Sequence, residues 1–181
     1  MNPEARVIAW SEMDSPVGPL TLAMTTQGIC YIDFGKGDRA QIELKLWARR
    51  QICGARLERR DRELEPAAQQ LREYFEGNRR CFDLPVDLYG TPFQLCVWRE
   101  LQSIPYGEVR SYKDVARAIG APKAVRAVGG ANNKNPVPIL VPCHRVIGST
   151  GSLVGYGGGL SIKEFLLNLE GVLLSQGSSV R

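Results

Sequence analysis

A proline-rich run that ends in a Cys-His pair restricts this chain more than any other feature of its sequence. Three prolines, Pro136, Pro138 and Pro142, lie within seven positions directly before Cys143 and His144. Proline fixes φ and has no N–H, so this run cannot be helical and cannot lie in the middle of a sheet. The sequence therefore predicts a stiff, irregular segment that delivers Cys143 to a defined place.

Cys143 differs from the other cysteines in its neighbours. A free cysteine is most often a small buried hydrophobic residue, but His144 and Arg145 place a proton acceptor and a positive charge beside this sulfur. At an ordinary pKa of ~8.5, only about 3% of a thiol is ionised at pH 7. We therefore expect a partly exposed, reactive Cys143 with a lowered pKa, helped by His144 through a water or a turn. Glu170 is a candidate to orient the imidazole, and a surface residue at a helix end is the alternative.

Cysteine and histidine usage bears on metals and compartment. The 181 residues include five cysteines and one histidine, with no C-x-x-C pair. We expect no metal site, and the odd cysteine count favours free thiols in a reducing compartment. No apolar run approaches the ~18 residues of a membrane span, and residues 1–10 lack the pattern of a secretory signal. A cytoplasmic protein without membrane association is the expectation.

The first half has the pattern of a small α/β domain. Residues 6–13, 20–26 and 29–35 are strand-like and separated by turn signals, which predicts an antiparallel meander. Two helices are expected, at about 39–52 and 65–76, and Pro85 favours an extended connector after them. We place an α/β N-terminal domain with a small antiparallel sheet at 1–84, and a second domain at 85–181.

Helix start signals dominate the second domain, which we expect to be mostly helical. Thr91 and Gln94 have the spacing of a capping box, which predicts a helix from there to about 104. Ser111 and Asp114 have a similar spacing, at the start of a short helix.

A helix-turn-helix is expected next. Gly120 ends the short helix, and Ala121-Pro122 begins a second one that continues to about 131. The second helix is rich in small residues, which permit close approach of its backbone to another molecule or to another helix. We expect Arg126 to point outward from this helix.

Positive charge gathers on the same segment. The net charge of the whole chain is +4, and residues 110–145 hold seven basic side chains against Asp114 alone. A localised basic surface suits a polyanion such as nucleic acid, whereas a solvated cationic face is the simpler interpretation.

Two further classes of protein would each explain part of this sequence pattern. A DNA-binding regulator or lesion sensor explains the basic hairpin and leaves Cys143 and His144 without a role. A cysteine hydrolase explains the Cys-His pair and leaves the hairpin without one.

The motifs together resemble a known family. The segments TPFQLCVWRELQSIPYGEVRSY at 91–112, ARAIGAPKAVRAVGGANNKNPVPILVPCHRVIG at 116–148 and GYGGGLSIKEFLLNLEG at 155–171 are similar, in order and spacing, to the O6-alkylguanine-DNA alkyltransferases, the methylated-DNA–protein-cysteine methyltransferases. The resemblance is strong over 85–173 and general over 1–84.

The resemblance implies a role for each matched residue. Cys143 accepts the alkyl group, His144 takes the thiol proton through water, and Glu170 orients His144. Arg126 fills the gap left by a flipped nucleotide. The remaining matched positions form two sets: residues that contact DNA, Tyr112, Lys123, Ala127, Gly129 and Lys134, and residues around the extruded base, Tyr112, Asn135, Val146, Tyr156 and Gly157.

The implied function is direct DNA repair. An alkyl group moves from O6-alkylguanine to Cys143 irreversibly, once per protein molecule, after the base is flipped out through the minor groove; O4-alkylthymine is left open as a second substrate. The partner is double-stranded DNA, with no cofactor, no metal and no obligate protein partner. We expect a monomer in the cytoplasm, associated with the nucleoid in a bacterium or nuclear in a eukaryote.

Overall fold

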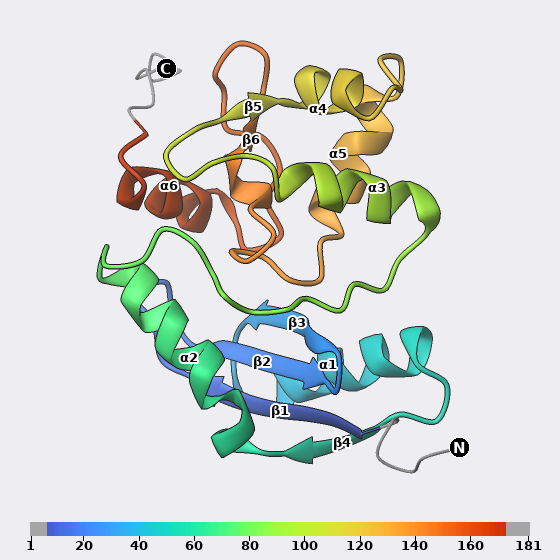
Figure 1. The fold of residues 1–181 in the computed structure, drawn as a ribbon, viewed down its shortest axis with the longest axis vertical. Coiled ribbons are helices and arrows are strands. Elements are labelled where there is room, and N and C mark those ends of the chain that lie inside the picture. The colour runs from blue at the N-terminus through green and yellow to red at the C-terminus, as the bar shows by residue number, and fades with distance from the viewer. Residues whose placement is uncertain (1–6, 173–181) are drawn as a thin grey trace. The chain divides into compact units, whose positions relative to one another are not determined.

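The structure, a computed structural model, describes residues 7–172, and these divide into two compact units (Figure 1). The division falls between Gly90 and Thr91, six residues after the position expected from sequence. The connector extends the first unit because it pairs with a strand there: the N–H of Ile29 donates to Pro85 O (2.8 Å) and the N–H of Asp87 donates to Ile29 O (2.8 Å).

The first unit is built on a four-stranded sheet. Its strands are β1 (Val7–Met13), β2 (Leu20–Thr25), β3 (Gly28–Phe34) and β4 (Arg56–Arg59), in the order β3-β2-β1-β4. The meander of β1, β2 and β3 is antiparallel, as predicted. The sheet as a whole is mixed, because a fourth strand that was not predicted, β4, pairs parallel to β1.

Two helices complete this unit. Helix α1 (Gly37–Gln51) connects β3 to β4, which is the crossover that a parallel neighbour for β1 requires. Helix α2 (Asp61–Phe75) begins four residues earlier than predicted, because Asp61 and Glu63 occupy its first turn, where acidic side chains complement the helix dipole.

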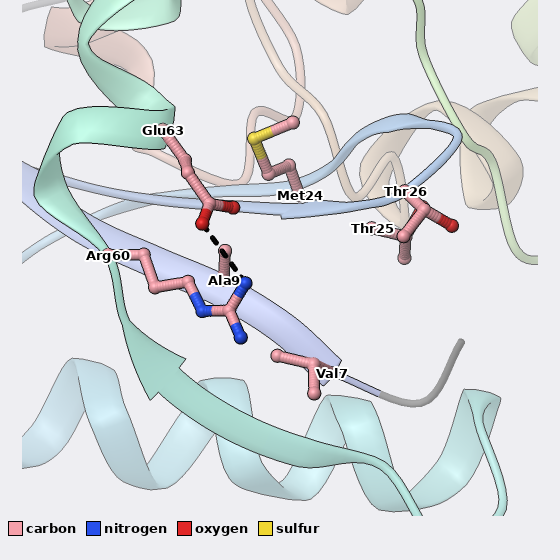
Figure 2. Close-up of a pocket in the computed structure, with 7 residues that line it drawn as sticks. All are labelled: Val7, Ala9, Met24, Thr25, Thr26, Arg60 and Glu63. Carbon is pink, nitrogen blue, oxygen red and sulfur yellow. Dashed lines mark hydrogen bonds and ion pairs between the residues drawn. The ribbon is translucent and has the colours of Figure 1, made fainter. Parts of the chain in front are cut away.

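A small cavity of about 80 Å³ opens in this unit (Figure 2). Figure 2 shows that Arg60 and Glu63, two of its polar lining residues, point toward each other, and their side chains form an ion pair of 3.0 Å. The cavity contains none of the residues for which the sequence predicts a role. Its lining consists of Val7, Ala9, Met24, Thr25, Thr26, Arg60 and Glu63.

The second unit is mostly helical. Its α-helices are α3 (Pro92–Leu101), α4 (Tyr112–Ala118), α5 (Val125–Asn133) and α6 (Leu160–Leu169), and a one-turn 3₁₀ helix, η2, covers Cys143–Arg145. Two short strands, β5 (Arg110–Ser111) and β6 (Val146–Ile147), pair in parallel. This two-stranded ladder was not predicted, and it brings the segment after Cys143 beside the start of α4.

Both predicted capping boxes are present. The Thr91 hydroxyl accepts from the Gln94 N–H while the Gln94 side chain accepts from the Thr91 N–H. Ser111 and Asp114 do the same at the start of α4. Each box satisfies donors that a helix N-terminus otherwise leaves unpaired, which is why both helices start where the sequence places them.

Helices α4 and α5 form the predicted helix-turn-helix. Gly120 ends α4 with φ of +73°, a conformation that favours glycine. Helix α5 starts at Val125, later than expected, because residues 121–124 form a turn in which the N–H of Ala124 donates to Ala121 O (2.8 Å). Proline presets φ for the second position of such a turn, so Pro122 begins a turn here and not a helix.

Candidate active site

The proline-rich run ends as a buried turn that presents Cys143. Only 4% of Cys143 is exposed, and its N–H donates to Val141 O at 2.8 Å. The expectation of a partly exposed cysteine is therefore wrong for the structure described here. The physical reason is that the apolar residues between the prolines pack inward: Val137, Ile139 and Val141 are all buried.

Two asparagines fix this turn. The Asn135 amide donates to Val141 O (2.8 Å) and its oxygen accepts from the N–H of Val137 (3.0 Å). From α5, the Asn132 amide donates to Cys143 O (3.3 Å). The helix-turn-helix is thus connected directly to the residue that carries the thiol.

Burial determines the acidity of this thiol. Desolvation raises the pKa of Cys143 to about 11, although a hydrogen bond with Asn135, the charge of Lys163 and a hydrogen bond with Tyr156 act in the opposite direction. The expected lowering of the thiol pKa is thus wrong for the protein alone. Burial disfavours the charged form more than the neighbours favour it.

The single histidine and Glu170 lie together, as the sequence predicted. His144 Nε2 is 2.8 Å from Glu170 Oε1, and both side chains are fully buried. Burial lowers the pKa of His144, although its hydrogen bond with Glu170 opposes this. A neutral imidazole that donates from Nε2 to a carboxylate keeps Nδ1 as a proton acceptor. Within residues 7–172, this buried Nδ1 has no hydrogen-bond partner.

Arg145 holds the same carboxylate. Its Nε donates to Glu170 Oε2 (2.8 Å) and its Nη2 donates to Oε1 (3.0 Å), while Nη1 donates to Ile104 O (2.6 Å). Burial alone would raise the pKa of Glu170, but hydrogen bonds from His144 and Arg145 outweigh it and hold that pKa well below its usual range. Arg145 is therefore a buried partner of Glu170 and not part of a surface basic patch.

Tyr112 and Lys163 meet at one carbonyl. The Tyr112 hydroxyl donates to Val154 O (3.0 Å), and Lys163 Nζ donates to the same oxygen (3.0 Å) and to Val146 O (2.5 Å). Lys163 Nζ also lies 5.9 Å from the centre of the Tyr112 ring. These contacts connect α4, β6 and α6 around the segment that follows Cys143.

Tyr156 and Gly157 complete the predicted pocket set. Tyr156 is buried, and its hydrogen bond with Cys143 is one of the influences on the thiol pKa. Gly157 is exposed, and a Cβ added there would meet only Asn133 O at 3.7 Å, an ordinary contact. The backbone at Gly157 is therefore accessible.

The residues matched to DNA contacts lie on the helix-turn-helix. Arg126 and Ala127 in α5 are exposed, as are Lys123 before it and Lys134 after it. Gly129 is half-buried and lies next to Tyr112: a Cβ added at Gly129 would lie 3.9 Å from the tyrosine ring. The predicted orientation of Arg126 is confirmed.

Neither a metal cluster nor a membrane span is found in residues 7–172. No group of three or more His, Cys, Asp or Glu side chains in this range is placed to hold a metal ion. No helix in the same range is both long enough and apolar enough to cross a lipid bilayer.

Three site residues were not predicted from the sequence: Asn132, Arg145 as a carboxylate partner, and Lys163. A signal existed for Lys163, because it precedes Leu166 and Leu167 by three and four positions and so lies on the apolar face of α6.

The fold and site define a class: a two-domain protein whose helix-turn-helix domain holds a buried thiol beside an imidazole-carboxylate pair. Two family models match, the ribonuclease-like domain of 6-O-methylguanine DNA methyltransferase over residues 8–88 and its DNA binding domain over 92–172. A methylated-DNA–protein-cysteine methyltransferase of Methanosarcina barkeri is 48% identical over 159 residues, covering 87% of this chain and 94% of the relative. The chain belongs to this family of methyltransferases.

Similar solved structures support this family assignment. The Mycobacterium tuberculosis O6-methylguanine methyltransferase is 42% identical and matches with a TM-score of 0.75, covering 90% of this chain and 92% of that one. The same organism's protein in complex with DNA matches with a TM-score of 0.74 at 42% identity, covering 91% and 92%. The predicted fold class and the prediction of a protein-cysteine methyltransferase are confirmed.

Proposed function

We propose that this protein repairs alkylated duplex DNA directly, by moving the alkyl group of O6-alkylguanine onto Cys143. The observation that carries the proposal is the His144–Glu170 pair next to Cys143: an ionised carboxylate 2.8 Å from Nε2 keeps the proton there and leaves Nδ1 as an acceptor. A buried thiol needs such a base, because its own pKa is raised.

The chemical step transfers one alkyl group to the sulfur of Cys143. The thiol proton of Cys143 passes to His144 Nδ1 through one water, the sulfur attacks the alkyl carbon, and the carbon–O6 bond breaks with its electron pair going to the guanine. A thioether forms, and the imidazolium is stabilised by Glu170. Water does not hydrolyse a thioether as it does a thioester, so each protein molecule acts once.

Two donors support the leaving guanine in this proposal. The Tyr112 hydroxyl exchanges Val154 O for N3 of the base, and the Gly157 N–H donates to O6. Such donors stabilise negative charge as it develops. The carbonyls of Cys143 and Val146 accept from the exocyclic amine, Tyr156 forms one wall, and Asn135 holds the turn. Gly157 carries no side chain, and a Cβ there would meet only Asn133 O at 3.7 Å, so the pocket accommodates adducts larger than methyl.

The helix-turn-helix supplies the DNA contact. A base stacked in a duplex hides its O6 group, so the enzyme has to extrude it. Arg126 takes the place of the extruded base, and exposed Ala127 and half-buried Gly129 let α5 approach the minor groove closely. Lys123 and Lys134 face the phosphates. This readout depends little on sequence, which suits lesions at arbitrary positions.

The protein acts as a monomer on double-stranded DNA, without a cofactor or an obligate protein partner, in the cytoplasm of a prokaryote or the nucleus of a eukaryote. O4-alkylthymine is a second substrate of the same pocket.

A pair of cysteine variants tests the proposal. Cys143→Ser should bind duplex DNA and fail to remove methyl from O6-methylguanine, because a serine hydroxyl ionises far less readily than a thiol. Cys96→Ser is the matched control, since Cys96 is exposed in the same unit. Removal of methyl by Cys143→Ser at the wild-type rate contradicts the proposal. Hydrolysis of ester substrates favours a cysteine hydrolase, and binding without transfer by the wild type favours a lesion sensor.

A further inference from the structure

Asn132 carries a buried oxygen that has no partner. The residue lies in α5 and is 2% exposed, and its Nδ2 donates to Cys143 O at 3.3 Å. That carbonyl fixes the orientation of the amide, because an amide oxygen would be repelled by it and only the nitrogen can donate. Oδ1 therefore faces other groups, and among residues 7–172 it finds no hydrogen-bond partner. Buried acceptors without a partner are rare in folded proteins, so this one requires an explanation.

The fold alone does not need an amide at this position. Cys143 O also accepts from the N–H of Val146, so this oxygen stays paired without Asn132. The same turn is held by Asn135, whose amide donates to Val141 O at 2.8 Å. An apolar side chain of similar shape at 132 would remove the unpaired oxygen, and such a replacement costs little stability.

Asn132 faces the part of the site that receives the base in the proposed reaction. Gly129 precedes it by one turn of α5, and a Cβ added at Gly129 would lie 3.9 Å from the Tyr112 ring. Residues three positions apart share a helix face, so Asn132 lies on the side of α5 toward Tyr112. In the proposed reaction, Tyr112 donates to N3 of the base and Cys143 O accepts from its exocyclic amine. N3 and this amine are adjacent on guanine, and Asn132 adjoins both of their protein partners.

The exocyclic amine is the donor that this oxygen lacks. O6-alkylation removes the N1 hydrogen of guanine, so the amine, which lies on the minor-groove edge, holds the only N–H groups of the extruded base. Oδ1 is one amide width from Nδ2, which is 3.3 Å from Cys143 O. An amine hydrogen directed at Cys143 O is thus within reach of Oδ1, and one N–H shared between two acceptors is a familiar arrangement in proteins.

We propose that Asn132 is a specificity-determining residue whose Oδ1 recognises guanine by accepting a hydrogen bond from its exocyclic amine, an inference that rests on the proposed transfer to Cys143. The amide is in position before the base arrives, because Nδ2 is already bonded to Cys143 O. A base without the amine leaves Oδ1 unpaired inside the occupied site, which is unfavourable. Asn132 therefore favours O6-alkylguanine over an alkylated base that lacks this amine.

Two variants remove the oxygen. Asn132→Leu keeps the branched shape of the side chain and removes both Oδ1 and Nδ2. Asn132→Ala removes the same two atoms without adding bulk, so it tests the inference if the leucine does not fit. The matched control is Asn168→Leu, which makes the same replacement at an exposed amide in α6 of the same unit.

The measurement compares single-turnover transfer from two duplexes that differ only in this amine, one with O6-methylguanine and one with O6-methylhypoxanthine. Trypsin releases residues 135–145 as one peptide, in which Cys143 is the only cysteine, and methyl on this peptide reports the rate. One neutral hydrogen bond changes an equilibrium by a factor of about 2 to 10. The wild-type preference for guanine should fall by that factor in both Asn132 variants and stay unchanged in Asn168→Leu, and the melting temperature of Asn132→Leu should stay close to that of the wild type.

Several results would overturn the inference. One is an unchanged preference for guanine in the Asn132 variants, and another is a wild type that shows no preference. A purely structural amide lowers the melting temperature and slows transfer from both duplexes alike. Equal slowing, complete loss included, combined with slower alkylation of Cys143 by iodoacetamide assigns Asn132 to the water between Cys143 and His144 instead. Absence of methyl on Cys143 in the wild type contradicts the proposed function, which is a separate outcome from an unchanged preference.

Discussion

Replacing Glu170 with glutamine tests how the buried pair is held together. The Glu170 carboxylate accepts from His144 Nε2, from two nitrogens of Arg145 and from the N–H of Gly107 (3.2 Å). Glu170→Gln keeps the shape, but it replaces one acceptor oxygen with an NH₂ donor that faces other donors. Arg145, which is 6% exposed, then keeps its charge without a counter-ion.

The expected loss of stability is large. Removing one partner of a buried ion pair costs about 3–5 kcal/mol. One kcal/mol lowers the melting temperature of a protein of 150–250 residues by about 2–4 °C, so the melting temperature should fall by roughly 6–20 °C.

The loss should depend on pH in a defined direction. The pKa of Glu170 in the folded protein lies well below its usual range, whereas in the unfolded chain it is ordinary, ~4.3. The stabilisation from this carboxylate is therefore complete above about pH 4.3 and is lost as the pH falls through the folded pKa. The difference in unfolding free energy between wild type and Glu170→Gln should narrow steadily below about pH 4.

Urea unfolding at a series of pH values measures this difference. The matched control is Glu108→Gln, because Glu108 pairs with Arg110 at 2.9 Å in the same unit but both side chains are about half exposed. An exposed pair contributes at most about 1 kcal/mol. Equal stabilities of Glu170→Gln and wild type at pH 7, or a difference that stays constant down to pH 2.5, would refute the reasoning.

Three further predictions concern DNA, the leaving group and a helix cap. Arg126→Ala should reduce repair of duplex DNA much more than reaction with free O6-benzylguanine. Only the duplex requires extrusion of the base, which costs a few kcal/mol. Equal losses of rate on both substrates would show that Arg126 serves the pocket or the fold instead. Tyr112→Phe should slow single-turnover transfer by about 10²-fold, the usual effect of removing one donor to a developing anion, and an unchanged rate would remove Tyr112 from the chemistry. Ser111→Ala should destabilise the protein by about 1 kcal/mol in urea unfolding through loss of its capping bond to Asp114, and unchanged stability would show that the cap contributes nothing.

Features with local causes were predictable from sequence. The capping boxes at Thr91 and Ser111 depend on residues three positions apart, so the helices start where expected. The need of an imidazole for an orienting acceptor made Glu170 a candidate partner of His144, with a surface residue as the alternative, and the family resemblance then assigned it that role.

Features with non-local causes were not predictable. Strand β4 has the sequence RLER, without alternating apolar residues, and it exists because β1 pairs with it across α1. Burial of Cys143 and Arg145 likewise depends on what packs over them. Residue spacing alone does not reveal that an arginine in a basic segment is turned inward to Glu170.

The central claim is that Cys143 receives the alkyl group once. In the most direct measurement, the protein is incubated with duplex DNA that contains a single O6-methylguanine. The mass of the tryptic peptide of residues 135–145 is then determined by mass spectrometry. We predict one added methyl group on Cys143, reaching a plateau of one per protein molecule however much damaged DNA is supplied. Methyl on Cys53, Cys81 or Cys96 instead, no methyl on the protein, or demethylation of more DNA than protein would contradict the account.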